Sequence, residues 1–317
     1  MARALSERPD LAQLRRQAKE LHRDAAVGEA DATARLRAVS ERVSLSAAQL
    51  AVAREYGFAS WPRLKVEVDR RRCIDRGDVD GLARLVAAEP GLARDTVRSC
   101  LSPAGASALG YLGVGRFHAR FDHGRVGELT RVLLAAGAPV DGSPDDGETP
   151  LITAASYGEL DMARVLIAAG ADLEATGHVE LGGTALGHAI NFGMIDIVDL
   201  LVGAGARIRN IVDAAGAGNL GGYLTPDTAV EDKARALQAA AVCERLAVID
   251  ELLAAGVPVD ADVDGATALH AAAMNGKARS VARLLAHGAD PNRIDANYQS
   301  TPLGWCRHRR SGWGPAD

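Results

Sequence analysis

A single pattern recurs along the chain and constrains its fold more than any other feature. A short segment carries leucine near its start and ends in glycine, and a second apolar segment then runs to another glycine. The leucine and the glycine that ends the second segment are 19 residues apart at four places. Such a fixed interval indicates an array of structural repeats. The leucine–glycine pairs are 151–170, 186–205, 237–256 and 269–288.

The residues of this pattern predict a pair of helices in each repeat. Thr149 followed by Pro150 is typical of a helix N-cap and of the first helical position, which tolerates proline. Gly158, Gly193 and Gly276 end the first apolar segments, where glycine can adopt the left-handed conformation that terminates a helix. Because one helix pair cannot bury its apolar face alone, the pairs must stack. We therefore expect an all-α solenoid.

The pattern resembles the ankyrin repeat, which spans about 33 residues and carries a T-P-L-H-x-A signature. Thr267-Ala-Leu-His-Ala-Ala matches it best, and Thr149-Pro-Leu and Thr301-Pro-Leu match its start. The resemblance covers roughly residues 73–310 and implies about seven units, the last one a half repeat. In that family the histidine of the signature, here His270, is expected to tie together the turns between repeats. The resemblance does not identify a function, because the fold serves many partners.

The array is irregular at two places. The repeat near 208–228 is short, because Asn219-Leu-Gly-Gly-Tyr-Leu replaces a second helix. An insertion is predicted near 115–127. Either segment could cover part of the surface that the first helices form.

Residues 1–72 do not fit the repeat. Leu11, Leu14, Ala18 and Leu21 lie on one face of a predicted helix. The segment around Gly57-Phe-Ala-Ser-Trp resembles a helical leader that precedes ankyrin repeats in many bacterial proteins, with Ser60 as a helix N-cap. We expect 1–72 to cap the solenoid at 73–310, and 311–317 to form a tail.

The charge distribution limits the classes of partner that the chain is expected to bind. The chain has a net charge of −5, which argues against general attraction to nucleic acid. Residues 1–72 hold 15 Lys and Arg against 10 Asp and Glu, and the remainder holds 21 against 31. The acidic remainder favours a basic partner. Because no apolar run is long enough to span a bilayer and no secretory signal is apparent, we expect a cytoplasmic protein without a membrane partner.

A helical wheel predicts which side chains of the first helices face a concave groove. Positions two, five and six after the leucine point away from the core. The favoured hypothesis is a non-catalytic module that binds a protein or peptide through these side chains and the acidic loop tips. The predicted anchors are Tyr157, His188, Asn191, Phe192, Asp213 and Trp305. The predicted acidic loop residues are Asp145, Asp146, Glu148, Glu180 and Asp264.

A second hypothesis remains open. Tyr157, His188 and Asp213 project from neighbouring repeats and could form a small-molecule pocket or an acid–base site. No nucleophile, phosphate-binding or metal-ligand motif accompanies them, so no cofactor is expected. His118 and His123 provide too few ligands to predict a metal site. The four cysteines are far apart and are expected to be reduced thiols.

Overall fold

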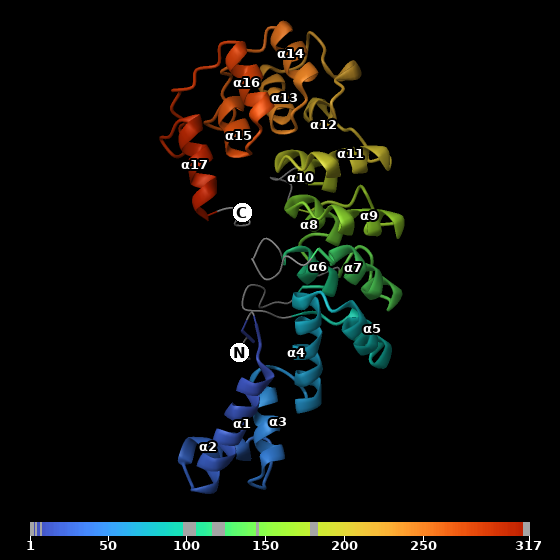
Figure 1. Cartoon of the computed structure of the whole chain (residues 1–317), viewed down its shortest axis with the longest axis vertical. Helices are drawn as coiled ribbons and strands as arrows, with labels where there is room; N and C mark the ends of the chain where they lie inside the picture. Colours follow the sequence, from blue (N-terminus) through green and yellow to red (C-terminus); the bar gives the residue numbers. More distant parts are fainter. Residues whose placement is uncertain are drawn as a thin grey trace. The chain divides into compact units, whose positions relative to one another are not determined.

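The computed structural model describes residues 3, 5–6, 8–97, 106–115, 124–143, 146–177 and 183–312, the side chains of 308–312 excepted. These residues are mostly helical and form no named strand. They fall into two compact units, which divide after Pro139. Unit 1 contains α1 to α7 and unit 2 contains α8 to α17 (Figure 1).

Unit 1 begins with a cluster of helices around α1. Leu14, Ala18 and Leu21 of α1 are buried, and Leu11 is partly buried against them, as the periodicity predicts. Ser60 caps the next long helix by accepting a hydrogen bond from the Arg63 N–H, which confirms the predicted cap. The helices are α1 (Leu11–Ala26), α2 (Ala30–Arg37), α3 (Leu45–Glu55), α4 (Trp61–Arg76), α5 (Val79–Ala88), η1 (Pro90–Ala93), α6 (Ala108–Gly113) and α7 (Val126–Ala135).

Helix α4 joins the leading helices to the first repeat. It runs without interruption through residue 72 and ends at Gly77, which adopts a left-handed conformation with φ of 67°. Helix α4 contacts α3 at one side and α5 at the other. The division of the chain at residue 72 and the capping role of 1–72 remain predictions. Most of the predicted insertion at 115–127, with His118 and His123, lies outside the described residues.

Unit 2 stacks helix pairs in chain order. In Figure 1 the first helices of the pairs follow one another along one side of the unit and the second helices along the other. Thr149 caps α8 by accepting a hydrogen bond from the Ile152 N–H at 3.2 Å, and Gly158 ends it with φ of 77°. The predicted cap and terminator are thus confirmed. The helices are α8 (Pro150–Tyr157), α9 (Leu160–Ala168), α10 (Ala185–Asn191), α11 (Ile195–Gly203), α12 (Ile211–Ala217), η3 (Gly221–Tyr223), α13 (Val230–Val242), α14 (Leu246–Ala254), α15 (Ala268–Met274), α16 (Ala278–Ala286) and α17 (Pro302–Gly312).

The short repeat brings α10 and α13 into contact. As predicted, a single 3-10 turn, η3, follows α12 where other repeats have a full second helix. Helix α13 packs against both α12 and α10. Lys277, at the start of α16, donates a hydrogen bond to the Gly193 carbonyl at 2.8 Å. The shortened repeat therefore lets side chains from distant repeats meet at the turns between first and second helices.

Candidate functional site

We call the half-buried and exposed side chains on, or directly after, the first helices α8, α10, α12, α15 and α17 the inner-helix face. Tyr157 of α8 is half-buried, Phe192 directly after α10 is half-buried, and Asn191 is exposed. Helices α8 and α10 are in contact, so the two aromatic side chains project from neighbouring repeats. Burial, and to a lesser degree the negative charge of Glu148, raises the pKa of the Tyr157 phenol. At neutral pH that phenol is therefore uncharged.

The structure corrects the expectation that His188 faces an open groove. Its side chain is fully buried, with 0% exposed, and its Nδ1 atom lies 2.9 Å from the Ser156 Oγ of α8. The ring centroids of His188 and Phe192 are 6.4 Å apart. The helical wheel fails here because a stacked first helix is covered by a neighbour on each side as well as by its own second helix. The exposed stripe is therefore narrower than the wheel suggests, and His188 lies beneath the surface, next to Phe192.

Asp213 of α12 was likewise expected on the groove, but it is buried, with 8% exposed. Its carboxylate accepts a hydrogen bond from the Arg209 N–H at 3.0 Å. Burial raises the pKa of Asp213, and the Arg209 hydrogen bond and charge offset this only in part. Among the described residues, no hydrogen bond joins Asp213 to His188, because each side chain has a different partner. The predicted acid–base pair is thus not assembled in this structure.

Trp305 lies at the far end of unit 2 on α17. Its indole N–H donates a hydrogen bond to Asp295 at 2.9 Å, and its ring meets those of His270 and Tyr298 edge-on. His270 accepts a hydrogen bond from the Thr267 N–H at Nδ1, so Nε2 carries the proton. The Nε2–H group donates a hydrogen bond to the Ser300 carbonyl at 3.2 Å. This confirms that His270 ties adjacent repeats together. Trp305 is partly a structural residue, which the sequence alone did not indicate.

The acidic loop residues are spread over several turns. Asp146 accepts a hydrogen bond from the Ser143 N–H, and Glu148 is half-buried close to Tyr157. Asp264 is exposed, with its carboxylate 3.8 Å from Arg235. Asp145 and Glu180 lie outside the described residues.

The described residues offer little for metal or thiol chemistry. Within the described ranges no three His, Cys, Asp or Glu side chains are grouped closely enough to hold a metal ion. Cys73 and Cys243 are free and buried, and burial raises the pKa of each thiol to about 11. Thiols with such a pKa are poor nucleophiles at neutral pH. No described helix is both long and apolar enough to cross a bilayer.

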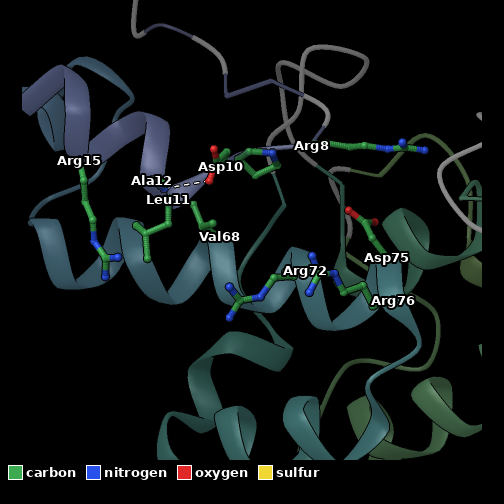
Figure 2. Close-up of a pocket in the computed structure, with 10 residues that line it drawn as sticks. Arg8, Asp10, Leu11, Ala12, Arg15, Val68, Arg72, Asp75 and Arg76 are labelled. Carbon is green, nitrogen blue, oxygen red and sulfur yellow. Dashed lines mark hydrogen bonds between the residues drawn. The ribbon is translucent and has the colours of Figure 1, made fainter.

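Unit 1 holds a cavity that the sequence did not predict. It measures about 640 Å³ and lies between the first turns of α1, with the residues before it, and the second half of α4 (Figure 2). Arg72 and Arg76 extend along α4 in the same direction, Arg15 reaches from α1 toward α4, and Arg8 points away from these three (Figure 2). The lining residues are Arg8, Pro9, Asp10, Leu11, Ala12, Arg15, Val68, Arg72, Asp75 and Arg76.

A buried charge cluster lies on the same helix. Arg70 and Arg71 of α4 are both fully buried, and each is hydrogen-bonded to Glu67. Arg70 also donates to the carbonyl oxygens of Leu92, Asp95 and Thr96, which lie after α5. Two guanidinium groups thus share one carboxylate in the interior. The run of three arginines at 70–72 was the only signal in the sequence for this cluster.

A comparison with known protein families agrees with the repeat pattern. A model of ankyrin repeats in three copies matches residues 118–211 and 216–295, which is more than half of the chain. The chain is 35% identical over 107 residues to E3 ubiquitin-protein ligase XB3 of Oryza sativa subsp. japonica, covering 34% of this chain and 21% of that protein. It thus spans only about a fifth of that relative's length. The crystal structure of the human ASB11 ankyrin repeat domain matches with a TM-score of 0.41 and 24% identity, covering 74% of this chain and 89% of that one. By its repeat pattern and the extent of the family match, this chain belongs to the ankyrin-repeat family.

Proposed function

We propose that unit 2 binds a protein or peptide partner through the inner-helix face, with Tyr157 and Phe192 as the main anchors. Ankyrin repeats are generally protein-interaction modules. The observation that supports this proposal is the pair of half-buried aromatic side chains that neighbouring first helices present. A buried His188–Ser156 hydrogen bond joins these two helices, and the His188 ring lies 6.4 Å from the Phe192 ring. A rigid aromatic side chain that is only half-buried loses little conformational entropy on binding and offers a large apolar area.

Asn191 and Trp305 extend the proposed surface along α10 and α17. Asn191 is exposed and can form hydrogen bonds with a partner's backbone, whereas Trp305 presents only the part of its ring that His270 and Tyr298 leave free. In this proposal His188 and Asp213 act from the interior, by holding α8, α10 and the turn before α12 in place.

A basic partner fits the loop tips of unit 2. Asp146, Glu148 and Asp264 belong to turns between repeats, where carboxylates raise the rate of encounter with a positively charged protein more than the final affinity. Because of their positions in the sequence, Asp145 and Glu180 are included in the same proposed acidic surface. If it holds, association slows as the ionic strength rises, while the dissociation rate changes little.

The acid–base alternative is less well supported. It requires Tyr157, His188 and Asp213 to reach a substrate together, and two of the three are buried with separate hydrogen-bond partners. An uncharged phenol at Tyr157 is also a poor general base.

The test compares three forms of the full chain as bait in cells of the source organism, with each co-purifying protein quantified by mass spectrometry. The forms are wild type, the double variant Tyr157→Ala/Phe192→Ala, and the control Val202→Ala on the second helix α11, where Val202 is exposed. We expect recovery of a specific partner to fall at least about tenfold in the double variant and to stay unchanged in the control. Equal recovery with all three forms would place the interface elsewhere.

A further inference from the structure

We propose that the cavity between α1 and α4 in unit 1 binds a small phosphomonoester, with Arg15, Arg72 and Arg76 as the groups that recognise its phosphate. This site is separate from the proposed protein-binding surface on unit 2. The inference rests on the cavity's size, on the charges that line it, and on how those charges are already paired.

The size of the cavity suits a small organic molecule. Its volume of about 640 Å³ falls within the range of ligand pockets in proteins. Leu11 and Val68 give part of its wall an apolar character, while the charged side chains lie around them (Figure 2). Such a mixture suits a ligand with a charged group at one end and an apolar body at the other.

The lining charges leave an unbalanced positive field. The lining holds four arginines, of which Arg8 points away from the other three, and two aspartates, both of which are already engaged within the protein. Asp10 accepts a hydrogen bond from the Ala12 N–H at 2.8 Å and so caps α1. Asp75 accepts a hydrogen bond from the Tyr111 hydroxyl at 3.3 Å. The lining therefore carries a formal net charge of +2, or +1 without Arg8, which favours an anion such as a phosphomonoester.

Among the described residues, Arg15, Arg72 and Arg76 have few ion-pair partners. Arg72 forms an ion pair with the half-buried Asp69 at 2.6 Å, whereas Arg15 and Arg76 form no ion pair in the part of the chain that the structure describes. Arg72 and Arg76 are four residues apart on one helix, an arrangement in which like charges destabilise the helix. An anion between them would relieve that repulsion.

The interior of α4 adds to the positive field. Arg71, buried beside Arg72, lies over the Tyr111 ring at 5.8 Å, and Tyr111 in turn bonds Asp75 of the cavity wall. The Nη2 atom of Arg71 is buried without a hydrogen-bond partner among the described residues. Arg70, Arg71 and Glu67 together carry one more positive charge than negative charge in the interior of the same helix. Guanidinium groups bind phosphate through paired N–H donors, which favours phosphate over a simple halide.

The test uses isothermal titration of the purified full chain with two probes of nearly identical shape. Phenyl phosphate is close to a dianion at neutral pH, and phenyl sulfate is a monoanion. We expect phenyl phosphate to bind at least about tenfold more tightly than phenyl sulfate, and inorganic phosphate to bind more weakly than phenyl phosphate because it leaves the apolar wall uncovered.

Two variants and one control locate the site. Arg72→Gln and Arg76→Gln should each weaken phenyl phosphate binding about tenfold, whereas Arg16→Gln, on α1 but outside the cavity lining, should not. All three residues are exposed, so the variants are expected to fold, and their thermal unfolding midpoints verify this. The proposal is overturned if phenyl phosphate does not bind, if phenyl sulfate binds equally well, or if Arg16→Gln weakens binding as much as the others. Tighter binding of a phosphoserine peptide than of phenyl phosphate would also overturn it, in favour of a protein ligand.

Discussion

Replacing Gly216 by alanine adds one methyl group where α12 packs against Ile190 of α10. A Cβ atom on Gly216 would lie 2.6 Å from Cγ1, 2.7 Å from Cγ2 and 2.8 Å from Cδ1 of Ile190. Ile190 is itself buried, and its two γ carbons are attached directly to Cβ, so a rotation of the side chain cannot move both away. The two helices must therefore separate or Ile190 must leave its preferred rotamer.

Two opposing contributions to the free energy of unfolding decide the effect of Gly216→Ala. Alanine in a helix interior is favoured over glycine by about 1 kcal/mol, whereas overpacking a well-filled core costs about 1–3 kcal/mol. The overpacking cost should win, so Gly216→Ala is expected to lower the free energy of unfolding by up to about 2 kcal/mol. Gly203, at the end of α11, is the matched control, because a Cβ there meets no atom within 4 Å. Gly203→Ala should stabilise by up to about 1 kcal/mol.

The assay is urea unfolding of the full chain, followed by far-UV circular dichroism, for both variants and for each in an Ile190→Ala background. Removing the Ile190 side chain should abolish most of the penalty at Gly216 and leave the effect at Gly203 unchanged. If Gly216→Ala stabilises the protein as Gly203→Ala does, α10 and α12 do not pack as described. If Ile190→Ala leaves the penalty intact, the clash has another source.

Three further variants test how buried charges are accommodated. Desolvation raises the pKa of Asp295, but hydrogen bonds from Tyr298, Trp305, Ser300 and Asn297 outweigh it and lower the pKa to about 2, so Asp295→Asn should destabilise. That loss should be full above the unfolded pKa near 3.9 and should disappear as the pH of urea unfolding falls toward 2; a pH-independent loss would contradict the assignment. For Asp213 the expected change in the free energy of unfolding has the opposite sign, because burial raises the pKa of its carboxyl group. Asp213→Asn should stabilise the protein above that pKa, and the gain should vanish on acidification. Destabilisation at neutral pH would show that the carboxylate is needed. Glu67→Gln leaves Arg70 and Arg71 without a negative partner and should cost about 3–5 kcal/mol in urea unfolding; a change below about 1 kcal/mol would mean that water reaches the cluster.

The repeat fold could be predicted because its signals are local. The cap at Thr149, the left-handed glycine at 158 and the leucine spacing each act within one helix pair, and the stacking follows from them. The missing second helix after α12 was also readable, because Gly221 and Gly222 interrupt the apolar pattern.

The surface of the array was harder to predict, because exposure depends on neighbours that are far away in the sequence. His188 belongs to a helix covered on both sides, and Asp213 turns back to its own loop rather than outward. Half-exposed Tyr157 and Phe192 were identified from the same wheel, and they lie on the accessible stripe. A wheel drawn for one helix therefore distinguishes core positions from other positions. It does not distinguish side chains that are buried against a neighbouring repeat from side chains that are exposed to solvent.

The cavity in unit 1 had no signal that a sequence reading could isolate. Its arginines come from segments about 60 residues apart, and nothing in their spacing indicates that the first turns of α1 and the second half of α4 line one cavity. The positive charge of residues 1–72 indicated only that this segment differs from the rest. Tertiary contact alone gathers Arg15, Arg72 and Arg76 around one space.

Hydrogen–deuterium exchange of the full chain with and without its co-purified partner tests the proposed interface most directly. Binding through the inner-helix face should slow exchange in α8 and α10, around Tyr157 and Phe192, while exchange in the second helices α9 and α11 stays the same. Protection confined to α9 and α11, or to unit 1, would contradict the proposal that the inner-helix face binds the partner.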